Sequence, residues 1–190
     1  RNCIKPANDW LLELDFNGAE IRVLLGLLGL EQPKQDIHQW NIDNIYRGNI
    51  AREDAKKRIF AWLYNPNSKK IENSIYDRES ILDQYYDGEK VTTPFGRKIV
   101  VDKQKSLNYI IQSTTADLVN ERAVAIDKFL EDKESFVSHI VHDEVVVDMP
   151  DSERHLIPDI KEIFSNNKLD NFKTNLKAGK DYYNLGDLNL

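Results

Sequence analysis

The segment SFVSHIVHDEVVVDMP, residues 135–150, holds a histidine and two acids between two apolar runs. Apolar runs of this length are typical of strands, and two residues suffice to join antiparallel strands in a hairpin. We therefore expect strands at Val137–Val141 and Glu144–Asp148, with the turn at His142-Asp143. Because burying unpaired carboxylates is unfavourable, such acids belong at an exposed tip or beside a cation. The acidic turn is therefore a candidate for chemistry.

The rest of the chain mixes strand and helix patterns. A strand with acids near its end is predicted at 9–16, DWLLELDF, and an apolar helix at 18–29. Other expected elements are a helix at 36–46 with Asp36 as N-cap, a helix at 52–64 stopped by Asn65-Pro66, a loop at 67–75, a helix at 76–87, a hairpin at 90–101 turning near Pro94-Gly96, helices at 106–131 and 152–165, and a strand near 174–178. Because these elements lack βαβ regularity, we expect an α+β domain built on a small antiparallel sheet.

Composition sets limits on the class of protein. With 190 residues, 41% of them hydrophobic and 31% charged, the chain is expected to form one well-packed soluble domain. The longest apolar run, Val23 to Leu30, is too short to cross a bilayer, so we expect no membrane partner. A net charge of −6 argues against a generic nucleic-acid binder, which is usually basic. A single cysteine, Cys3, excludes an internal disulfide and fits a reducing compartment.

Two aspartates, Asp15 and Asp143, each lie at the end of an apolar strand. If these strands are neighbours in one sheet, both carboxylates converge at one edge. Two like charges held together need a counter-cation, and Mg²⁺ prefers such oxygen ligands. Paired carboxylates with two such ions suit phosphoryl transfer. The alternative is that each aspartate is a solvated turn residue without a chemical role.

The predicted helix REDAKKRIFAWLY carries Arg52, Lys56, Phe60 and Tyr64 at intervals of four. Residues four apart lie on one side of a helix, so these four form a stripe that is cationic at one end and aromatic at the other. A nucleoside triphosphate has the same arrangement, with phosphates at one end and a base and sugar at the other, and Arg and Lys bind phosphate well. The alternative is an amphipathic helix with a solvated basic side.

Five segments, in this order along the chain, resemble the motifs of family A DNA polymerases. They are ELDFNGAEIRVLLGLLG, with an Asp, a Glu five residues later and then Ile-Arg; REDAKKRIFAWLY, with Arg-x3-Lys-x3-Phe-x3-Tyr; TPFGRK; NYIIQSTTADLV; and VHDEVVVDMP. The leading segment RNCIKP also resembles the stretch before the first motif. The resemblance covers nearly the whole chain.

This resemblance implies a polymerase palm, a small antiparallel sheet backed by helices, together with a helical fingers segment. The palm would comprise residues 1–30 and 89–190, and reduced fingers residues 31–88. The implied function is template-directed addition of deoxynucleotides to a primer 3′-hydroxyl by two-metal-ion phosphoryl transfer, with two Mg²⁺ ions as cofactors. The implied partners are a DNA primer-template and deoxynucleoside triphosphates. A phage-like or divergent member, in the cytoplasm of a bacterium or a phage-infected cell, is expected, and an organelle is also open.

The resemblance also implies roles for individual residues. Asp15 and Asp143 would hold the metal ions with the Phe16 carbonyl, Glu144 would support them, and Glu20 would exclude a ribose 2′-hydroxyl. The nucleotide-binding residues would be His38, Arg52 and Lys56 on the triphosphate, Phe60 on the sugar and base, and Tyr64 at the templating position. The residues contacting primer and template would be Arg97, Asn108, Gln112 and His142. For His142, Asn108 and Gln112 the alternative is a hydrogen-bonded turn or a solvated helix position.

The sequence departs from the family pattern in several places. Asn65 replaces a usual Gly and Gln104 a usual Arg, and the segments between Tyr64 and Gly96 and between His38 and Arg52 are short. Because Met149 is the only methionine and no thumb or exonuclease precedes Arg1, we expect a piece of a longer polypeptide, with those domains supplied by the rest of the chain or by another chain. Two other functions remain open: an inactive nucleic-acid-binding relative that needs a partner, and a metal-dependent nuclease.

Overall fold

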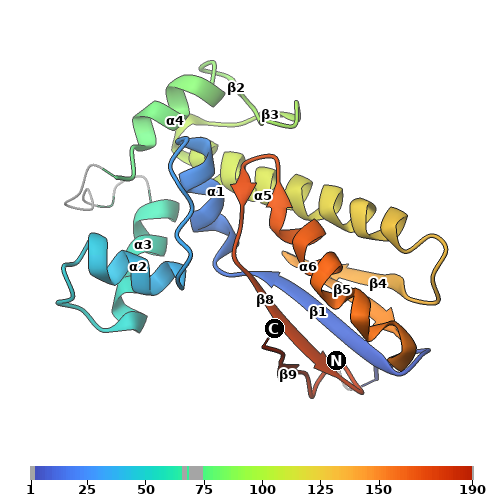
Figure 1. Ribbon diagram of the computed structural model, residues 1–190. Helices are drawn as coiled ribbons and strands as arrows, with labels where there is room; N and C mark the ends of the chain where they lie inside the picture. The colour runs from blue at the N-terminus through green and yellow to red at the C-terminus, as the bar shows by residue number, and fades with distance from the viewer. Residues whose placement is uncertain (1–2, 66–67, 69–74, 190) are drawn as a thin grey trace. The chain divides into compact units, whose positions relative to one another are not determined.

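A computed structural model describes residues 3–65, 68 and 75–189, and it divides into two compact units. Unit 1 comprises Arg1–Ala19 and Ala116–Leu190, and unit 2 comprises Glu20–Thr115. Among the described residues, no helix combines the length and the apolar character needed to span a membrane. The α+β class expected from the sequence is confirmed, with a five-stranded antiparallel sheet and helices (Figure 1).

The sheet of unit 1 has β1 (Trp10–Phe16) at its centre, in the strand order β4-β5-β1-β8-β9. The other strands are β4 (Phe136–Val141), β5 (Glu144–Met149), β8 (Thr174–Gly179) and β9 (Gly186–Asp187). The predicted hairpin is confirmed, with Val141 opposite Glu144 across the two-residue turn. The sequence did not predict β9 or the short pair β6 (Asn166–Asn167) and β7 (Asp170–Asn171), because strands of two residues carry no periodic pattern.

One side of this sheet packs against helices. Alternate residues of a strand point to opposite sides, so Leu12, Leu14 and Phe16 share one side of β1 and Leu11, Glu13 and Asp15 share the other. The ring of Phe16 stacks on Phe164 of α6 (Ile157–Ser165), with 4.2 Å between ring centroids. Phe16 is almost fully buried there, so this side anchors β1 and leaves Asp15 on the opposite side.

The helix predicted at 152–165 begins differently from the expectation. Residues Asp151–Leu156 form a 3-10 turn, and the α-helix starts at Ile157. Pro158 has no backbone N–H, so it cannot donate to the carbonyl of Arg154 as a regular helix requires. A proline is well tolerated in the first turn, and α6 therefore begins beside it.

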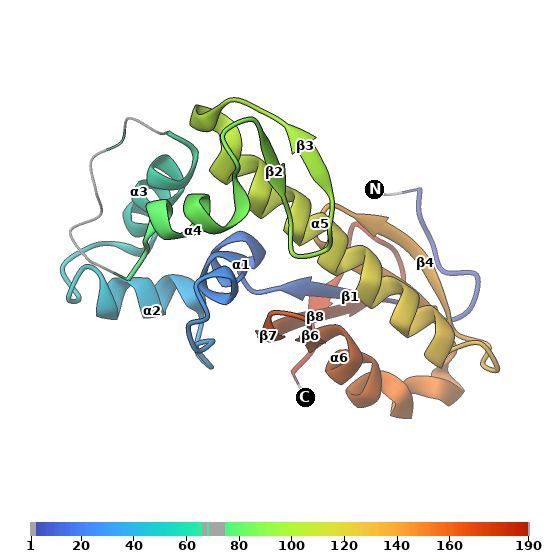
Figure 2. The same cartoon turned by 90° about the horizontal axis from the view of Figure 1, so that it is seen from above.

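Unit 2 is mainly helical. Its elements are α1 (Ala19–Leu27), α2 (Ile37–Asn44), α3 (Arg52–Tyr64), α4 (Arg78–Tyr85), the hairpin of β2 (Lys90–Thr92) and β3 (Lys98–Val100), and the first part of α5 (Lys103–Phe129). Figure 2 shows α2 and α3 next to each other, and the two helices are in contact. Asp36 caps α2 as predicted, because its side chain accepts a hydrogen bond from the Gln39 amide at 3.0 Å.

Helix α3 has the bounds that the sequence predicts. Glu53 and Asp54 lie in its first turn, where negative charge interacts favourably with the helix dipole. The side formed by Ala55, Ile59 and Trp62 is buried. The predicted loop at 67–75 lies largely outside the described residues.

Candidate active site

The acids of the first and last motifs lie on neighbouring strands of unit 1. In the register of β1 and β5, Asp15 is opposite Glu144, and Asp143 directly precedes Glu144 at the hairpin turn. We call Asp15, Asp143 and Glu144 the carboxylate cluster. The sequence-based condition that the two strands are neighbours is therefore confirmed.

Burial and mutual repulsion raise the pKa of two members of this cluster. Burial is the main reason that the pKa of Asp15 rises to about 6, and the charges of Asp143 and Glu144 add to the rise. A hydrogen bond from Asn175 Nδ2 to Asp15 Oδ2, 3.2 Å long, opposes it. The pKa of Asp143 is also raised, first by burial and then by Glu144. The folded protein therefore holds negative charge here at a cost, which a bound cation would offset.

The hairpin turn adopts a backbone conformation that few residue types accept. His142 has φ +58°, in the left-handed region. Histidine is one of the few residue types besides glycine, asparagine and aspartate that occur there with some frequency. This turn sets the direction in which Asp143 leaves the end of the strand.

A lysine from the neighbouring strand lies beside the cluster. On β8, Asn175 is opposite Asp15 and Lys177 is opposite Glu13. Lys177 Nζ pairs with Glu13 Oε1 at 2.6 Å, and this bond is the main cause of the raised pKa of Lys177. The Glu13 carboxylate is almost fully buried, so it requires such a partner. Lys177 also interacts electrostatically with Asp15 and Glu144, and so it lowers the charge density around the cluster.

Within the described part of the chain, no three His, Cys, Asp or Glu side chains are arranged so that they could hold a metal ion. The donor chemistry nevertheless suits a hard cation, since carboxylate oxygens are among the ligands that Mg²⁺ prefers. Mg²⁺ commonly takes only one or two carboxylates and completes its coordination with water and substrate phosphates. Phe16 directs its side chain into the core, so only its backbone carbonyl is available as a ligand.

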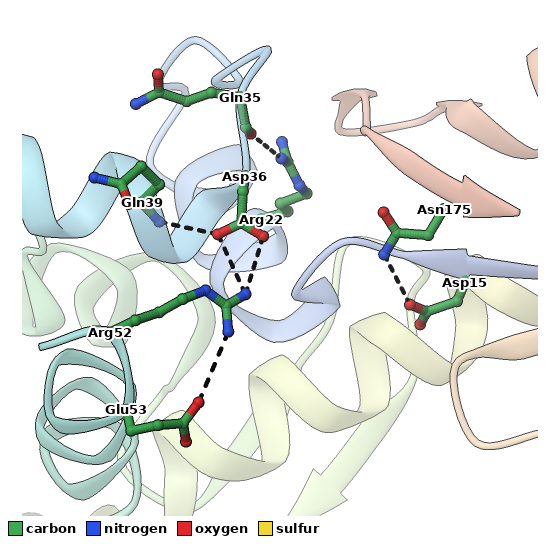
Figure 3. A network of polar contacts seen from close by, with 8 residues as sticks. All are labelled: Asp15, Arg22, Gln35, Asp36, Gln39, Arg52, Glu53 and Asn175. Atoms are coloured by element: carbon green, nitrogen blue, oxygen red, sulfur yellow. Dashed lines mark hydrogen bonds and ion pairs between the residues drawn. The ribbon is translucent and has the colours of Figure 1, made fainter. Parts of the chain in front are cut away.

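In unit 2, the stripe of Arg52, Lys56, Phe60 and Tyr64 lies on the solvent-accessible side of α3. Arg52, Lys56 and Tyr64 are exposed and Phe60 is half-buried. Arg52 contacts Asp36, the N-cap of α2, at 3.2 Å and, more distantly, its neighbour Glu53 at 3.8 Å (Figure 3). The Arg52 side chain is 50% exposed, so these ion pairs are weak and an incoming anion could replace them.

The aromatic end of the stripe is packed side by side. Phe60 and Tyr64 stack with a centroid distance of 6.0 Å, and His38 lies 6.3 Å from Phe60. The Tyr64 hydroxyl donates a hydrogen bond to the Glu20 carboxylate. The structure therefore brings together, within unit 2, four of the residues that the sequence assigned to nucleotide binding.

His38 is almost fully buried, and its Nδ1 atom has no hydrogen-bond partner among the described residues. Burial lowers its pKa, Asp36 raises it, and Arg52 and Lys56 lower it further. Within unit 2, His38 is therefore close enough to Arg52 and Lys56 to interact with them electrostatically. A neutral imidazole with one unpaired ring nitrogen remains able to bind a further polar group.

The residues predicted to contact DNA lie on two other elements of unit 2 and on the hairpin of unit 1. Arg97 follows the turn between β2 and β3, where its amide donates to Thr93 Oγ1 at 3.2 Å. Asn108 and Gln112 are four residues apart on α5, with Asn108 half-buried and Gln112 exposed. His142 is exposed at the tip of the β4–β5 hairpin. Whether these four residues contact DNA stays a prediction.

Sequence reasoning missed the residues that surround the carboxylate cluster. Asn175 and Lys177 come from β8, and Tyr182 follows that strand and donates a hydrogen bond to Glu144 Oε2 at 2.8 Å. No local pattern marks them, because their roles depend on pairing with a strand more than a hundred positions earlier. Asp36 was predicted as a helix cap, but its pairing with Arg52 was not.

Comparison with solved structures shows which fold this is. The chain is similar to the POL domain of Pol1 from M. smegmatis, solved in complex with DNA primer-template and dNTP. The TM-score is 0.74 at 16% sequence identity, and the similarity covers 94% of this chain and 41% of that chain. The fold is therefore that of a portion of a DNA polymerase domain, as the motifs predicted. No model of a protein family matches the sequence. No curated protein matches it either.

Proposed function

We propose that this chain is the palm and reduced fingers portion of a template-directed, family A-like DNA polymerase. It would add deoxynucleotides to a primer 3′-hydroxyl by two-metal-ion phosphoryl transfer. The observation that carries the proposal is the pairing of β1 with β5 in a polymerase fold, which places Asp15 opposite Glu144, the residue that follows Asp143. The division into palm, residues 1–30 and 89–190, and fingers, residues 31–88, is part of the proposal.

The carboxylate cluster supplies the metal-binding part of this function. Asp15 and Asp143 would hold two Mg²⁺ ions together with the Phe16 carbonyl, and Glu144 would support the two aspartates. Bound there, such ions activate the attacking hydroxyl and stabilise the leaving pyrophosphate. The raised pKa of both aspartates supports this assignment, because a bound cation most stabilises those carboxylates whose charged form the fold disfavours.

The stripe on α3 supplies the nucleotide-binding part. Arg52 and Lys56 would bind the triphosphate with His38, and their charges would offset the negative charge that develops during transfer. Phe60 would pack against the sugar and base, and Tyr64 would lie at the templating position. Glu20, held by the Tyr64 hydroxyl, would exclude a ribose 2′-hydroxyl. Little covalent chemistry is left to the protein, so positioning and electrostatics determine the rate.

The nucleic-acid partner would be a primer-template, contacted by Arg97, Asn108, Gln112 and His142. A net charge of −6 means that this portion neutralises few phosphates. We therefore infer that a thumb, and any exonuclease, would come from the rest of a longer chain or from another chain. Binding of a primer-template by this portion alone should be weak and should depend little on salt concentration.

Incubation of the protein with a labelled primer-template, Mg²⁺ and all four dNTPs tests the proposal. Template-dependent lengthening of the primer, absent in the Asp143→Asn variant, is the expected result. Shortening of the DNA without any extension would identify a nuclease instead. Binding without either reaction would identify an inactive relative. The same assay on a chain that carries a thumb separates a missing domain from a missing activity.

A further inference from the structure

The segment that follows β8 folds back onto the side of the sheet that carries Asp15. Tyr182 is 4% exposed and packs against Leu11 of β1 and Val146 of β5. Leu11 and Asp15 lie on the same side of β1, because they are four residues apart in a strand. Tyr182 is therefore part of the side of the sheet that bears the carboxylate cluster.

The phenol of Tyr182 reaches the cluster directly. Its hydroxyl donates a hydrogen bond of 2.8 Å to Glu144 Oε2. The edge of His139 in β4 meets the Tyr182 ring at 84°, with 5.1 Å between centroids. The Tyr182 amide donates to the Ile4 carbonyl at 3.0 Å. The ring is thus fixed by packing on several sides, and its hydroxyl has a defined position.

The turn that carries Tyr182 is itself held in one shape. Asp181 Oδ1 accepts hydrogen bonds from the amides of Tyr183 and Asn184, at 3.0 and 2.9 Å. A side chain on Gly179 would put a carbon 2.7 Å from the Asn184 carbonyl oxygen, so only glycine fits where the segment leaves β8. These contacts give the segment 180–185 the rigidity needed to orient a carboxylate.

We propose that Tyr182 is a positioning residue for the carboxylate cluster: its hydroxyl holds one oxygen of Glu144, and thereby fixes the direction of the acid that is opposite Asp15 and follows Asp143. A carboxylate held at one oxygen presents the other to its surroundings in a defined direction. Partners that orient metal-binding or catalytic carboxylates commonly contribute tenfold or more to affinity or rate. The segment 180–185 is therefore part of the working site and not only a cover for the sheet. The catalytic meaning of this inference rests on the proposed function.

Tyr182→Phe removes the hydroxyl and keeps the packed ring, and Tyr183→Phe is its matched control. Tyr183 is the next residue and is 66% exposed, so its hydroxyl is not held in the cluster. Binding of Mn²⁺ to the whole chain, measured by electron paramagnetic resonance, gives a readout that needs no catalysis. We expect about tenfold weaker Mn²⁺ binding in Tyr182→Phe, unchanged binding in Tyr183→Phe, and a similar thermal midpoint for both.

A double-mutant cycle with Glu144→Ala separates positioning from general support of the fold. If Tyr182 acts through Glu144, then Tyr182→Phe weakens Mn²⁺ binding in the parent but adds nothing in the Glu144→Ala background. Equal Mn²⁺ affinity of Tyr182→Phe and the parent, or an additional loss in the Glu144→Ala background, would overturn the proposal. In primer extension, we expect Tyr182→Phe to have a roughly tenfold lower kcat and an unchanged KM for dNTP. A parent that binds Mn²⁺ but extends no primer, even on a chain that carries a thumb, would overturn the polymerase assignment and leave the Tyr182 inference standing.

Discussion

The carboxylate cluster lies on the central strands of a sheet, whereas the cationic stripe lies on the exposed side of a helix. Asp15 is held by register between β5 and β8, and its charge is opposed by burial and by two other acids. Arg52 is half-exposed and contacts Asp36 and Glu53 through long side chains. The carboxylate cluster is therefore rigid and carries negative charge that the fold disfavours. The cationic stripe can change its side-chain conformations, and its Arg52 already forms weak ion pairs with two acids.

This difference suits the two kinds of ligand that we propose for the two regions. A small divalent cation needs oxygens in fixed positions, and the strain of holding like charges together is released when it binds. A triphosphate is flexible and highly charged, so a cationic surface that exchanges one set of anions for another suits it. We therefore expect substitutions in the first region to change rate and stability strongly, and substitutions around the second to change nucleotide affinity and selectivity.

The largest effect should come from Asp143→Asn. The change removes a negative charge at almost constant shape, so nucleotide addition should fall by about a thousandfold or more while the fold persists. Single-turnover primer extension with a thermal melt of each variant measures both. Asp15→Asn should behave alike, and the double variant should be little worse than either, because both residues act on the same ions. Retained Mg²⁺-dependent extension by Asp143→Asn would show that Asp143 does not hold a catalytic metal ion, and the proposed difference between the two regions would fail.

Selectivity against ribonucleotides should change by less. Glu20→Ala should raise the ratio of ribonucleotide to deoxynucleotide incorporation by roughly a hundredfold, since the site loses the bulk that meets a 2′-hydroxyl. Tyr64→Phe keeps the carboxylate but removes the hydroxyl that donates to it, so it should move the ratio in the same direction by only a few-fold. Competition between the two nucleotides opposite one template base measures the ratio. An unchanged ratio in Glu20→Ala would place the selecting group elsewhere.

A stability measurement tests the cost of the cluster without any reaction. The pKa of Asp15 is about 6 in the folded protein, above its ordinary value of 3.8, so the folded protein binds this proton more tightly than the unfolded chain does. The stabilisation from that proton is present at low pH and is lost as pH rises from about 4 to about 6. At pH 7.5 with a chelator present, Asp15→Asn should therefore be more stable than the parent by about 1–2 kcal/mol, after allowance for partial exposure.

The pH dependence distinguishes this explanation from a general effect of the substitution. The higher free energy of unfolding of Asp15→Asn, measured by urea denaturation, should approach that of the parent as pH falls toward 4. At that pH the Asp15 carboxyl of the folded parent is protonated and therefore as neutral as the Asn amide. Added Mg²⁺ should stabilise the parent and leave the variant unaffected. An advantage that is constant between pH 4 and 7.5 would show that repulsion within the cluster is not its source.

The smallest effect should come from Asp36→Asn. Asparagine still caps α2 through the Gln39 amide, but it loses the charge that pairs with Arg52. The exposed pair contributes little, so KM for dNTP should fall only about two- to threefold. Asp77→Asn is the matched control, because Asp77 caps α4 in the same way through Ser80. An equal change in KM for both variants would mean that Arg52 has no competition from Asp36.

The sequence predicted the long elements because local patterns determine them. The end of α3 follows from Asn65-Pro66 directly after it, and the β4–β5 hairpin follows from two apolar runs with two residues between them. The start of α6 and the short strands β6, β7 and β9 escaped prediction, because a proline effect or a two-residue pairing leaves almost no periodic signal.

The site was predictable to the extent that its residues belong to motifs. Asp15, Asp143 and the stripe on α3 each show a spacing that suggests chemistry, and the pairing of β1 with β5 was the single tertiary assumption. Lys177 and Tyr182 show no such spacing, since a lone lysine or tyrosine after a strand is common. Their position beside the cluster arises only when the end of the chain pairs with its beginning.

The central position of β1 also determines the order in which the molecule can be built. β1 is synthesised before both its neighbours, β5 and β8, which follow it by more than a hundred residues, whereas unit 2 is one continuous stretch. Closing such long loops is slow. We therefore expect unit 2 to acquire structure on the ribosome while the apolar strand WLLELDF is still unpaired with β5 and β8. Pulse-labelling hydrogen exchange during refolding should show protection of α2 and α3 before β1. During that interval β1 is the segment most in need of a chaperone, and mutations in β8 should lower the yield of soluble protein even where they spare every catalytic group.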